Sequence, residues 1–133
     1  MATSVTERPQ ADVEVRVPAD SAFVSVLRST AAGVASRLDF DLSTIEDLRV
    51  AVGEACALAL PQADEGSSLR AEFHLAPRHL TVRVSVTGTE VQAPDRESFA
   101  WQVLDTLASG ATTEVDGGLL AIVLGVGGES LPG

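Results

Sequence analysis

The chain has 133 residues, a length typical of one domain, and its hydrophobic fraction of 45% is enough for a single core. Nineteen acidic residues against nine arginines give a formal net charge of −10, which disfavours direct binding to nucleic acid. The charge suits a basic protein partner, or serves only to keep the protein in solution. The sequence has no lysine, asparagine or tyrosine, which excludes a phosphate-loop lysine, a lysine Schiff base and an asparagine metal ligand.

The cysteine, histidine and apolar content of the sequence exclude further kinds of site. Cys56 is the only cysteine, so an intrachain disulfide is excluded, and its apolar surroundings predict a small buried side chain. His74 and His79 lack the clustered ligands of a zinc site. Residues 1–10 contain no apolar signal core, and no apolar run is long enough to span a membrane. We therefore expect a cytoplasmic protein without a membrane partner.

The first predicted elements are a strand and a helix. Valines alternate with charged residues over 13–17, which indicates a half-buried strand that ends at Pro18. Asp20 or Ser21 can cap a helix that runs to about Leu38.

A second helix is predicted from the residues Ser43 to Glu46, which form a capping-box pattern. The helix runs to about Leu60, because Pro61 cannot continue it. Apolar residues at helical spacing define its core face: Ile45, Leu48, Val52, Cys56 and Ala59.

Two alternating runs, 69–75 and 80–86, predict an antiparallel hairpin with one buried face and a turn at 77–79. A loop over 88–95 precedes a third predicted helix at 96–108. We expect this helix to turn its apolar residues Phe99, Val103 and Leu107 inward.

Two final strands are predicted at 112–115 and 119–126. The resulting order, β-α-α-β-β-α-β-β, predicts an α+β fold: a two-layer sandwich of about five mostly antiparallel strands and three helices. We expect one domain over 12–127, with flexible tails at 1–11 and 128–133.

Two segments resemble a known family. Leu38–Phe40 followed by Asp47–Cys56 is similar to the glutamate-containing helix of the RsbW-type anti-sigma factor serine kinases. Residues 98–104, with the letters SFAWQVL, resemble the third helix of the actinobacterial branch of that family. The resemblance covers roughly residues 13–126 and implies a histidine kinase-like ATPase fold, also called the GHKL or Bergerat-type fold.

The resemblance also implies a function. Family members bind an alternative sigma factor of the stress or sporulation type and keep it from RNA polymerase. An anti-anti-sigma factor competes for them, and kinase members phosphorylate that competitor on serine or threonine with Mg-ATP. They are usually homodimers.

The resemblance assigns roles to individual positions. Glu54 matches the general base of the family, and four residues later the family has an asparagine that binds magnesium. Here that position is Leu58, which has no oxygen to offer a hard cation. Gly88 is the one glycine left where the family has an adenine-binding aspartate followed by glycines. Residues 91–95 are too short and too poor in glycine to form a phosphate-binding lid.

The nucleotide site is therefore expected to be degenerate, with no cofactor needed and with ATP and magnesium implied only by the family. Three functions remain open: a non-catalytic anti-sigma factor, an active serine kinase with a divergent site, and a regulatory module with another partner. For partner binding we consider Arg28 on the first helix and Trp101 and Gln102 on the third. Trp101 has an alternative interpretation as a core or dimer residue.

Overall fold

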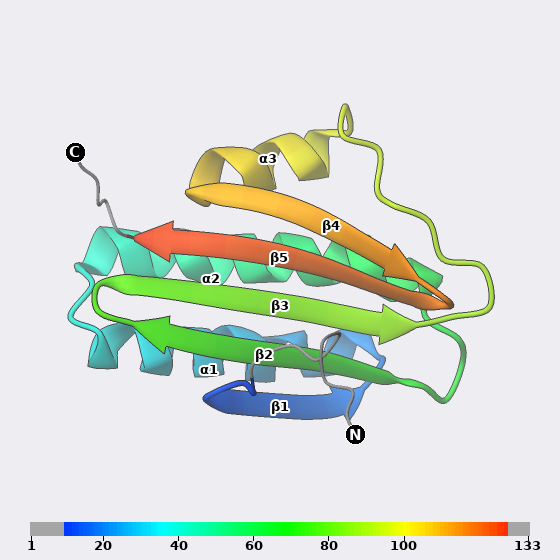
Figure 1. Cartoon of the computed structure of the whole chain (residues 1–133), viewed down its shortest axis with the longest axis horizontal. Helices are drawn as coiled ribbons and strands as arrows, with labels where there is room; N and C mark the ends of the chain where they lie inside the picture. The colour runs from blue at the N-terminus through cyan, green and yellow to red at the C-terminus, as the bar shows by residue number, and fades with distance from the viewer. Residues whose placement is uncertain (1–9, 128–133) are drawn as a thin grey trace, which may run out of the picture.

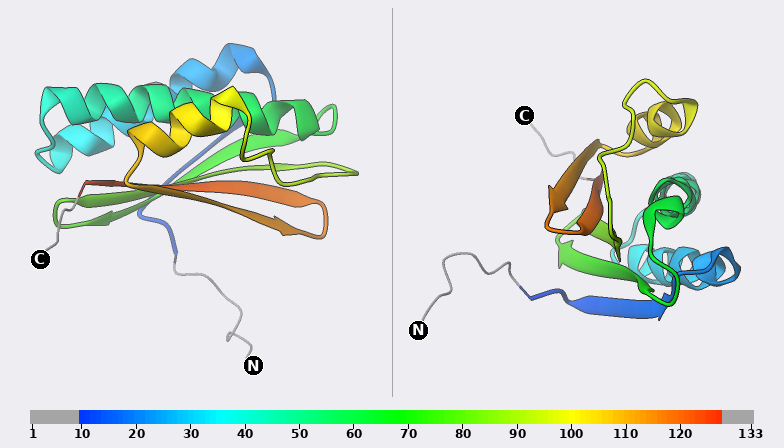
Figure 2. Two further views of the ribbon diagram at one scale, coloured as in Figure 1. Left: turned by 90° about the horizontal axis from the view of Figure 1, so that it is seen from above. Right: turned by 90° about the vertical axis from the view of Figure 1, so that its right-hand side faces the viewer.

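A computed structural model of the chain describes residues 10–127, in which three helices cover one face of a five-stranded sheet (Figures 1 and 2). The predicted tails lie outside these residues, apart from residues 10 and 11. The strands are β1 (Val13–Pro18), β2 (Ser68–Ala76), β3 (His79–Thr87), β4 (Gly110–Asp116) and β5 (Leu119–Gly127). The helices are α1 (Val24–Arg37), α2 (Leu42–Ala59) and α3 (Phe99–Leu107), with short 3₁₀ turns η2 (Ser21–Phe23) and η3 (Leu60–Gln62).

The predicted two-layer α+β sandwich is confirmed, together with the order of its elements. All neighbouring strands pair antiparallel, in the order β1-β2-β3-β5-β4. The alternation of apolar and polar residues determines which face of the sheet each side chain is on, because a strand turns successive side chains to opposite sides. On β3, Val82, Val84 and Val86 are buried against the helices, while Thr81 and Arg83 point to the other face.

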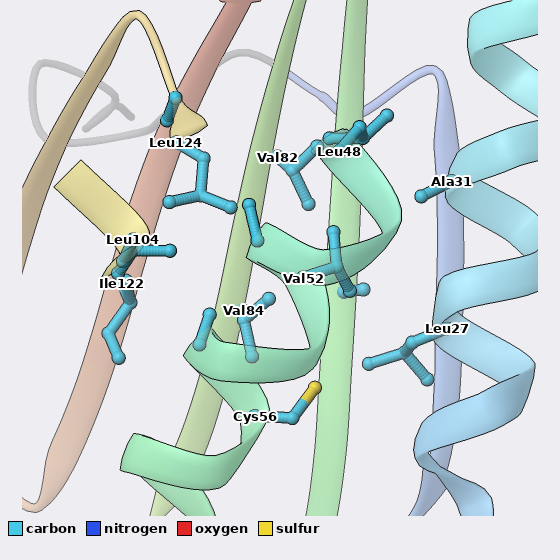
Figure 3. Close-up of a cluster of buried hydrophobic side chains, with 14 of the residues drawn as sticks. Leu27, Ala31, Leu48, Val52, Cys56, Val82, Val84, Leu104, Ile122 and Leu124 are labelled. Atoms are coloured by element: carbon cyan, nitrogen blue, oxygen red, sulfur yellow. The ribbon is translucent and has the colours of Figure 1, made fainter. Parts of the chain in front are cut away.

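The core lies between the helices and the inner face of the sheet, as Figure 3 shows. Leu27 of α1 and Val52 of α2 contribute to it from the helical layer, and Ile122 of β5 from the sheet. Each of these three side chains is fully buried. Helix α2 lies centrally in this layer, between α1 and α3 (Figure 2).

The start of α2 differs from the prediction. The cap is Asp41, whose carboxylate accepts a hydrogen bond from the Thr44 backbone N–H at 2.8 Å, so the predicted Ser43–Glu46 capping box is wrong. Ser43 lies within the first turn of the helix instead. The hydrogen bonds from Thr44 hold the pKa of Asp41 below its usual value. The helix to about Leu38 was predicted to be capped by Asp20 or Ser21, but Asp20 caps the 3₁₀ turn η2, where its carboxylate accepts from Ala22 N–H at 2.9 Å. Helix α1 itself begins after Phe23 without a side-chain cap.

Helix α3 also differs from the prediction, both in its start and in its orientation. It begins at Phe99, after Ser98, whose hydroxyl caps the Trp101 N–H at 3.2 Å. The predicted inward position of Phe99 is wrong, since its side chain is 84% exposed. Trp101 and Leu104 form the buried stripe of the helix.

The outer face of the sheet, opposite the helices, has an ionic network across its strands. Arg83 of β3 is only 6% exposed and donates to Glu72 of β2 at 3.1 Å and to Glu114 of β4 at 2.9 Å. To reach Glu114 the guanidinium passes over β5, where Ala121 is fully buried. At the sheet edge, Arg70 pairs with Glu14 in a more exposed position. Charged side chains therefore cover this face of the sheet.

Burial in the core raises the pKa of the Cys56 thiol to about 12, against the lowering influence of Arg28. A raised pKa in the folded state means that its contribution to stability is complete below the ordinary value of 9.0 and is lost as pH rises toward 12. We expect the free energy of unfolding to fall over that pH range, because the unfolded chain releases the proton more easily. The absence of lysine and tyrosine leaves no other side chain with an ordinary pKa in this window.

Urea unfolding followed by circular dichroism at several pH values between 8 and 11 measures this dependence. The Cys56→Ala variant is the control and should lose it. An identical alkaline decline in both proteins would contradict the assignment to Cys56.

Candidate functional site

Glu54 lies on α2 toward its solvent side and is half-buried. It forms neither a hydrogen bond nor an ion pair with any residue in the described part of the chain. Its side chain lines a hollow of about 370 Å³ between α1 and α2. The other lining residues are Arg28, Glu46, Arg49, Val50 and Gly53. The structure thus brings two of the predicted site residues, Glu54 and Arg28, to one hollow.

Arg28 extends from α1 toward Gly53 of α2. A β-carbon at Gly53 would lie 3.4 Å from the Arg28 Cδ, which is ordinary contact distance. The guanidinium is half-buried and makes no hydrogen bond or ion pair among residues 10–127. A partly desolvated guanidinium without a partner is suited to binding a carboxylate of another molecule.

Leu58, one turn after Glu54, is half-buried and packs against the core. Its side chain is hydrocarbon and offers no oxygen to Mg²⁺, which requires oxygen ligands. The packing of Leu58 therefore extends the apolar core at the position where the resemblance implied a magnesium ligand.

Gly88 directly follows β3 and lies against the segment after α2. A β-carbon at Gly88 would be 2.1 Å from the Gln62 carbonyl oxygen and 3.2 Å from Val91 Cγ1. Its N–H donates to the Gly118 carbonyl at 2.8 Å. The geometry gives this predicted cofactor residue a packing role, because a backbone carbonyl fills the space beside it.

Two side chains bind the loop after Gly88 to the segment that follows α2, from η3 to Asp64. Gln62 pairs with the backbone of Gln92 in both directions, donating from Nε2 at 2.8 Å and accepting at Oε1 at 2.6 Å. Asp64 accepts from the Thr89 N–H at 3.0 Å and from its hydroxyl at 2.9 Å. Sequence reasoning could not find this clamp, since its partners are 25 and 30 residues apart.

The clamped segments enclose an open cleft of about 590 Å³. Its charged lining residues are all acidic: Asp64, Glu90 and Asp95. Three carboxylates without a lysine or arginine in the lining repel a triphosphate.

On α3 the predicted partner residues Trp101 and Gln102 point to different sides. Trp101 is 3% exposed and belongs to the hydrophobic core, so its side chain offers little surface to a partner. Arg96 lies over its ring, with the guanidinium carbon 5.2 Å from the centroid. Gln102 is exposed, next to the exposed Phe99 that sequence reasoning placed inside.

Within residues 10–127, no group of three or more histidine, cysteine and acidic side chains is placed to hold a metal ion. No helix in the same range combines the length and apolar character needed to cross a bilayer.

The fold and the sequence together identify the family of the protein. The sequence profile of the histidine kinase-like ATPase domain matches residues 17–119, and the chain belongs to this family. Its sheet, helices and element order agree with that assignment.

Within the family, the chain is similar to proteins described as serine-protein kinase RsbW. The relative from Halalkalibacterium halodurans is 39% identical over 88 residues, covering 65% of this chain and 52% of the relative. The Bacillus subtilis relative is 37% identical over 79 residues, covering 57% of this chain and 49% of the relative. The chain thus spans about half the length of these curated relatives.

A solved structure shows the same fold. The crystal structure of the RsbU and RsbW domains of Rv1364c from Mycobacterium tuberculosis superimposes with a TM-score of 0.60 at 16% identity. The superposition covers 86% of this chain and 32% of that one.

Proposed function

We propose that the protein is an anti-sigma factor that sequesters an alternative sigma factor of the stress or sporulation type and is countered by an anti-anti-sigma factor. In this proposal it acts in the cytoplasm as a homodimer and works by occlusion, without efficient kinase activity. Similarity to the RsbW-type relatives supports the partner class. The observation that carries the proposed lack of efficient kinase activity is Leu58, a hydrocarbon side chain packed against the core where the resemblance implies a magnesium ligand.

Two further features support a function without ATP, and the residues at this site do not fit Mg-ATP. The charged side chains that line the cleft beside the clamped loop are all carboxylates. Glu54 lies in a different hollow, beside Arg28 rather than beside Gly88.

Binding assays with purified components test the proposal. Calorimetry should detect a complex with at least one alternative sigma factor from the same genome, and no heat on titration with millimolar Mg-ATP. The absence of any complex with those sigma factors, or with anti-anti-sigma factors, would refute the proposed function.

The runner-up is an active serine kinase, which the retained Glu54 favours because its carboxylate is free of ion pairs among residues 10–127. In that reaction the γ-phosphoryl group of ATP passes to a serine hydroxyl of the anti-anti-sigma factor, and ADP leaves. Transfer of radiolabelled phosphate to that protein, abolished by Glu54→Gln, would decide for the kinase.

We predict that Arg28 binds an acidic group of one of these partners. Arg28→Ala should weaken the complex about tenfold, corresponding to about 1.4 kcal/mol. Arg37→Ala is the matched control, because Arg37 is exposed in the last turn of the same helix. Calorimetric titration of both variants measures the effect, and equal affinities would exclude the hollow between α1 and α2 as a contact.

A further inference from the structure

Phe99 is the most exposed large hydrophobic residue in the described part of the chain, with 84% of its surface in contact with solvent. It is the first residue of α3. Isolated exposed apolar residues are common on protein surfaces, so exposure alone assigns no role. The surroundings of the ring must therefore show whether it belongs to a binding surface.

Phe99 is the first member of a stripe of side chains along the outer side of α3. Gln102, Val103 and Thr106 follow Phe99 at spacings of three, four and seven residues, which places them on one helix face. Gln102 and Thr106 are exposed and Val103 is half-buried. The opposite side of the helix, with Trp101 and Leu104, packs into the core. The exposed stripe is thus turned away from the rest of the domain.

Acidic side chains surround this stripe in the sequence. Glu90, Asp95, Glu97 and Asp105 are all exposed, and none forms an ion pair with another residue between 10 and 127. The one cation of the segment, Arg96, lies over the Trp101 ring. Four carboxylates against one guanidinium leave a net charge of about −3 on residues 90–105. Cationic side chains of a partner would complement this charge.

The segment before Phe99 is held in place before any partner arrives. Gln62 and Asp64 fix the loop at Gln92 and Thr89. Asp95 accepts from the Glu97 N–H at 2.9 Å, and Ser98 caps the helix. A surface ordered in advance loses little conformational entropy on binding, which favours affinity.

We propose that the Phe99 face, defined as Asp95, Glu97, Phe99, Gln102 and Asp105, is a docking surface for a basic segment of the sigma factor. The segment of the sigma factor receives the Phe99 ring in an apolar pocket and pairs its lysines or arginines with the carboxylates of the face. This inference rests on the proposed function. It adds a second contact surface, opposite in charge to the Arg28 guanidinium.

The test uses the full chain and the sigma factor that the wild-type protein binds. Phe99→Ala should weaken the complex at least tenfold and leave the melting temperature unchanged, because the ring is exposed. Leu42→Ala is the matched control, since Leu42 is 73% exposed at the start of α2 and lies outside the Phe99 face. Glu97→Gln combined with Asp105→Asn should lower the association rate and reduce its dependence on salt.

The outcomes separate the two proposals. If the wild-type protein binds a sigma factor and Phe99→Ala binds it equally well, the docking surface is refuted and the proposed function stands. If no sigma factor binds the wild-type protein, both are refuted. If Phe99→Ala instead converts a dimer to a monomer in light scattering, the face is a contact between two copies, and its assignment to a sigma factor is wrong.

Discussion

Replacing Gly88 with alanine is expected to lower the free energy of unfolding by about 2–4 kcal/mol. The added methyl group would lie 2.1 Å from the Gln62 carbonyl oxygen, far inside contact distance. The obstacle is backbone rather than a flexible side chain, so the loop or the end of α2 must move. Movement there also strains the hydrogen bonds of the Gln62 and Asp64 clamp.

Urea unfolding followed by circular dichroism measures this loss. Gly33→Ala is the control, because Gly33 lies within α1 and nothing comes within 4 Å of its added methyl group. That substitution should stabilise the protein by up to about 1 kcal/mol through higher helix propensity. A Gly88→Ala variant as stable as the wild type would contradict the packing role of Gly88.

The second large effect is expected at Arg83. Arg83→Met should destabilise the fold by about 3–5 kcal/mol, because it removes the cation that Glu72 contacts in a buried position. The side chains of Arg83 and Glu72 are only 7% and 9% exposed. Adding Glu72→Leu should restore much of the stability, since an apolar pair of similar volume needs no charge compensation.

Arg70→Met provides the comparison on the same face of the sheet. Arg70 and Glu14 are 42% and 45% exposed, so water screens their attraction. The substitution should lower the free energy of unfolding by less than about 1 kcal/mol. Equal losses for Arg70→Met and Arg83→Met in urea unfolding would show that burial does not set the strength of these ion pairs.

The strands were predictable because their apolar residues alternate with polar ones, so only one face of each strand can be buried. The leucine and valines at every second position of 80–86 can face the helices in only one way, and the hairpin pairs accordingly, with Leu75 opposite Leu80. Helix caps were less predictable, because Asp41 and Ser43 both have a suitable acceptor. The choice depends on where the chain leaves the left-handed residue Asp39, whose φ is 64°.

The face of α3 could not be deduced for a similar reason. Residues 99, 103 and 107 form one apolar stripe at helical spacing, and residues 101, 104 and 108 form another. The larger Trp101 ring and Leu104 pack inside, which turns Phe99 outward. The candidate site was predictable only by residue type. The sequence excludes a magnesium ligand at Leu58, but the contact of Gly88 with Gln62 depends on tertiary structure.

Trp101 can serve as an intrinsic fluorescent probe of binding. It is the only tryptophan of the chain, it is buried, and a guanidinium lies 5.2 Å from its ring centroid. Indole emission responds to nearby charge, and Arg96 and Phe99 are close neighbours of Trp101 in sequence. A basic partner that covers Phe99 and displaces Arg96 from the indole ring would change the emission without any attached dye. Occupancy of the Phe99 face can thus be followed in real time in the unlabelled protein, provided that the partner lacks tryptophan.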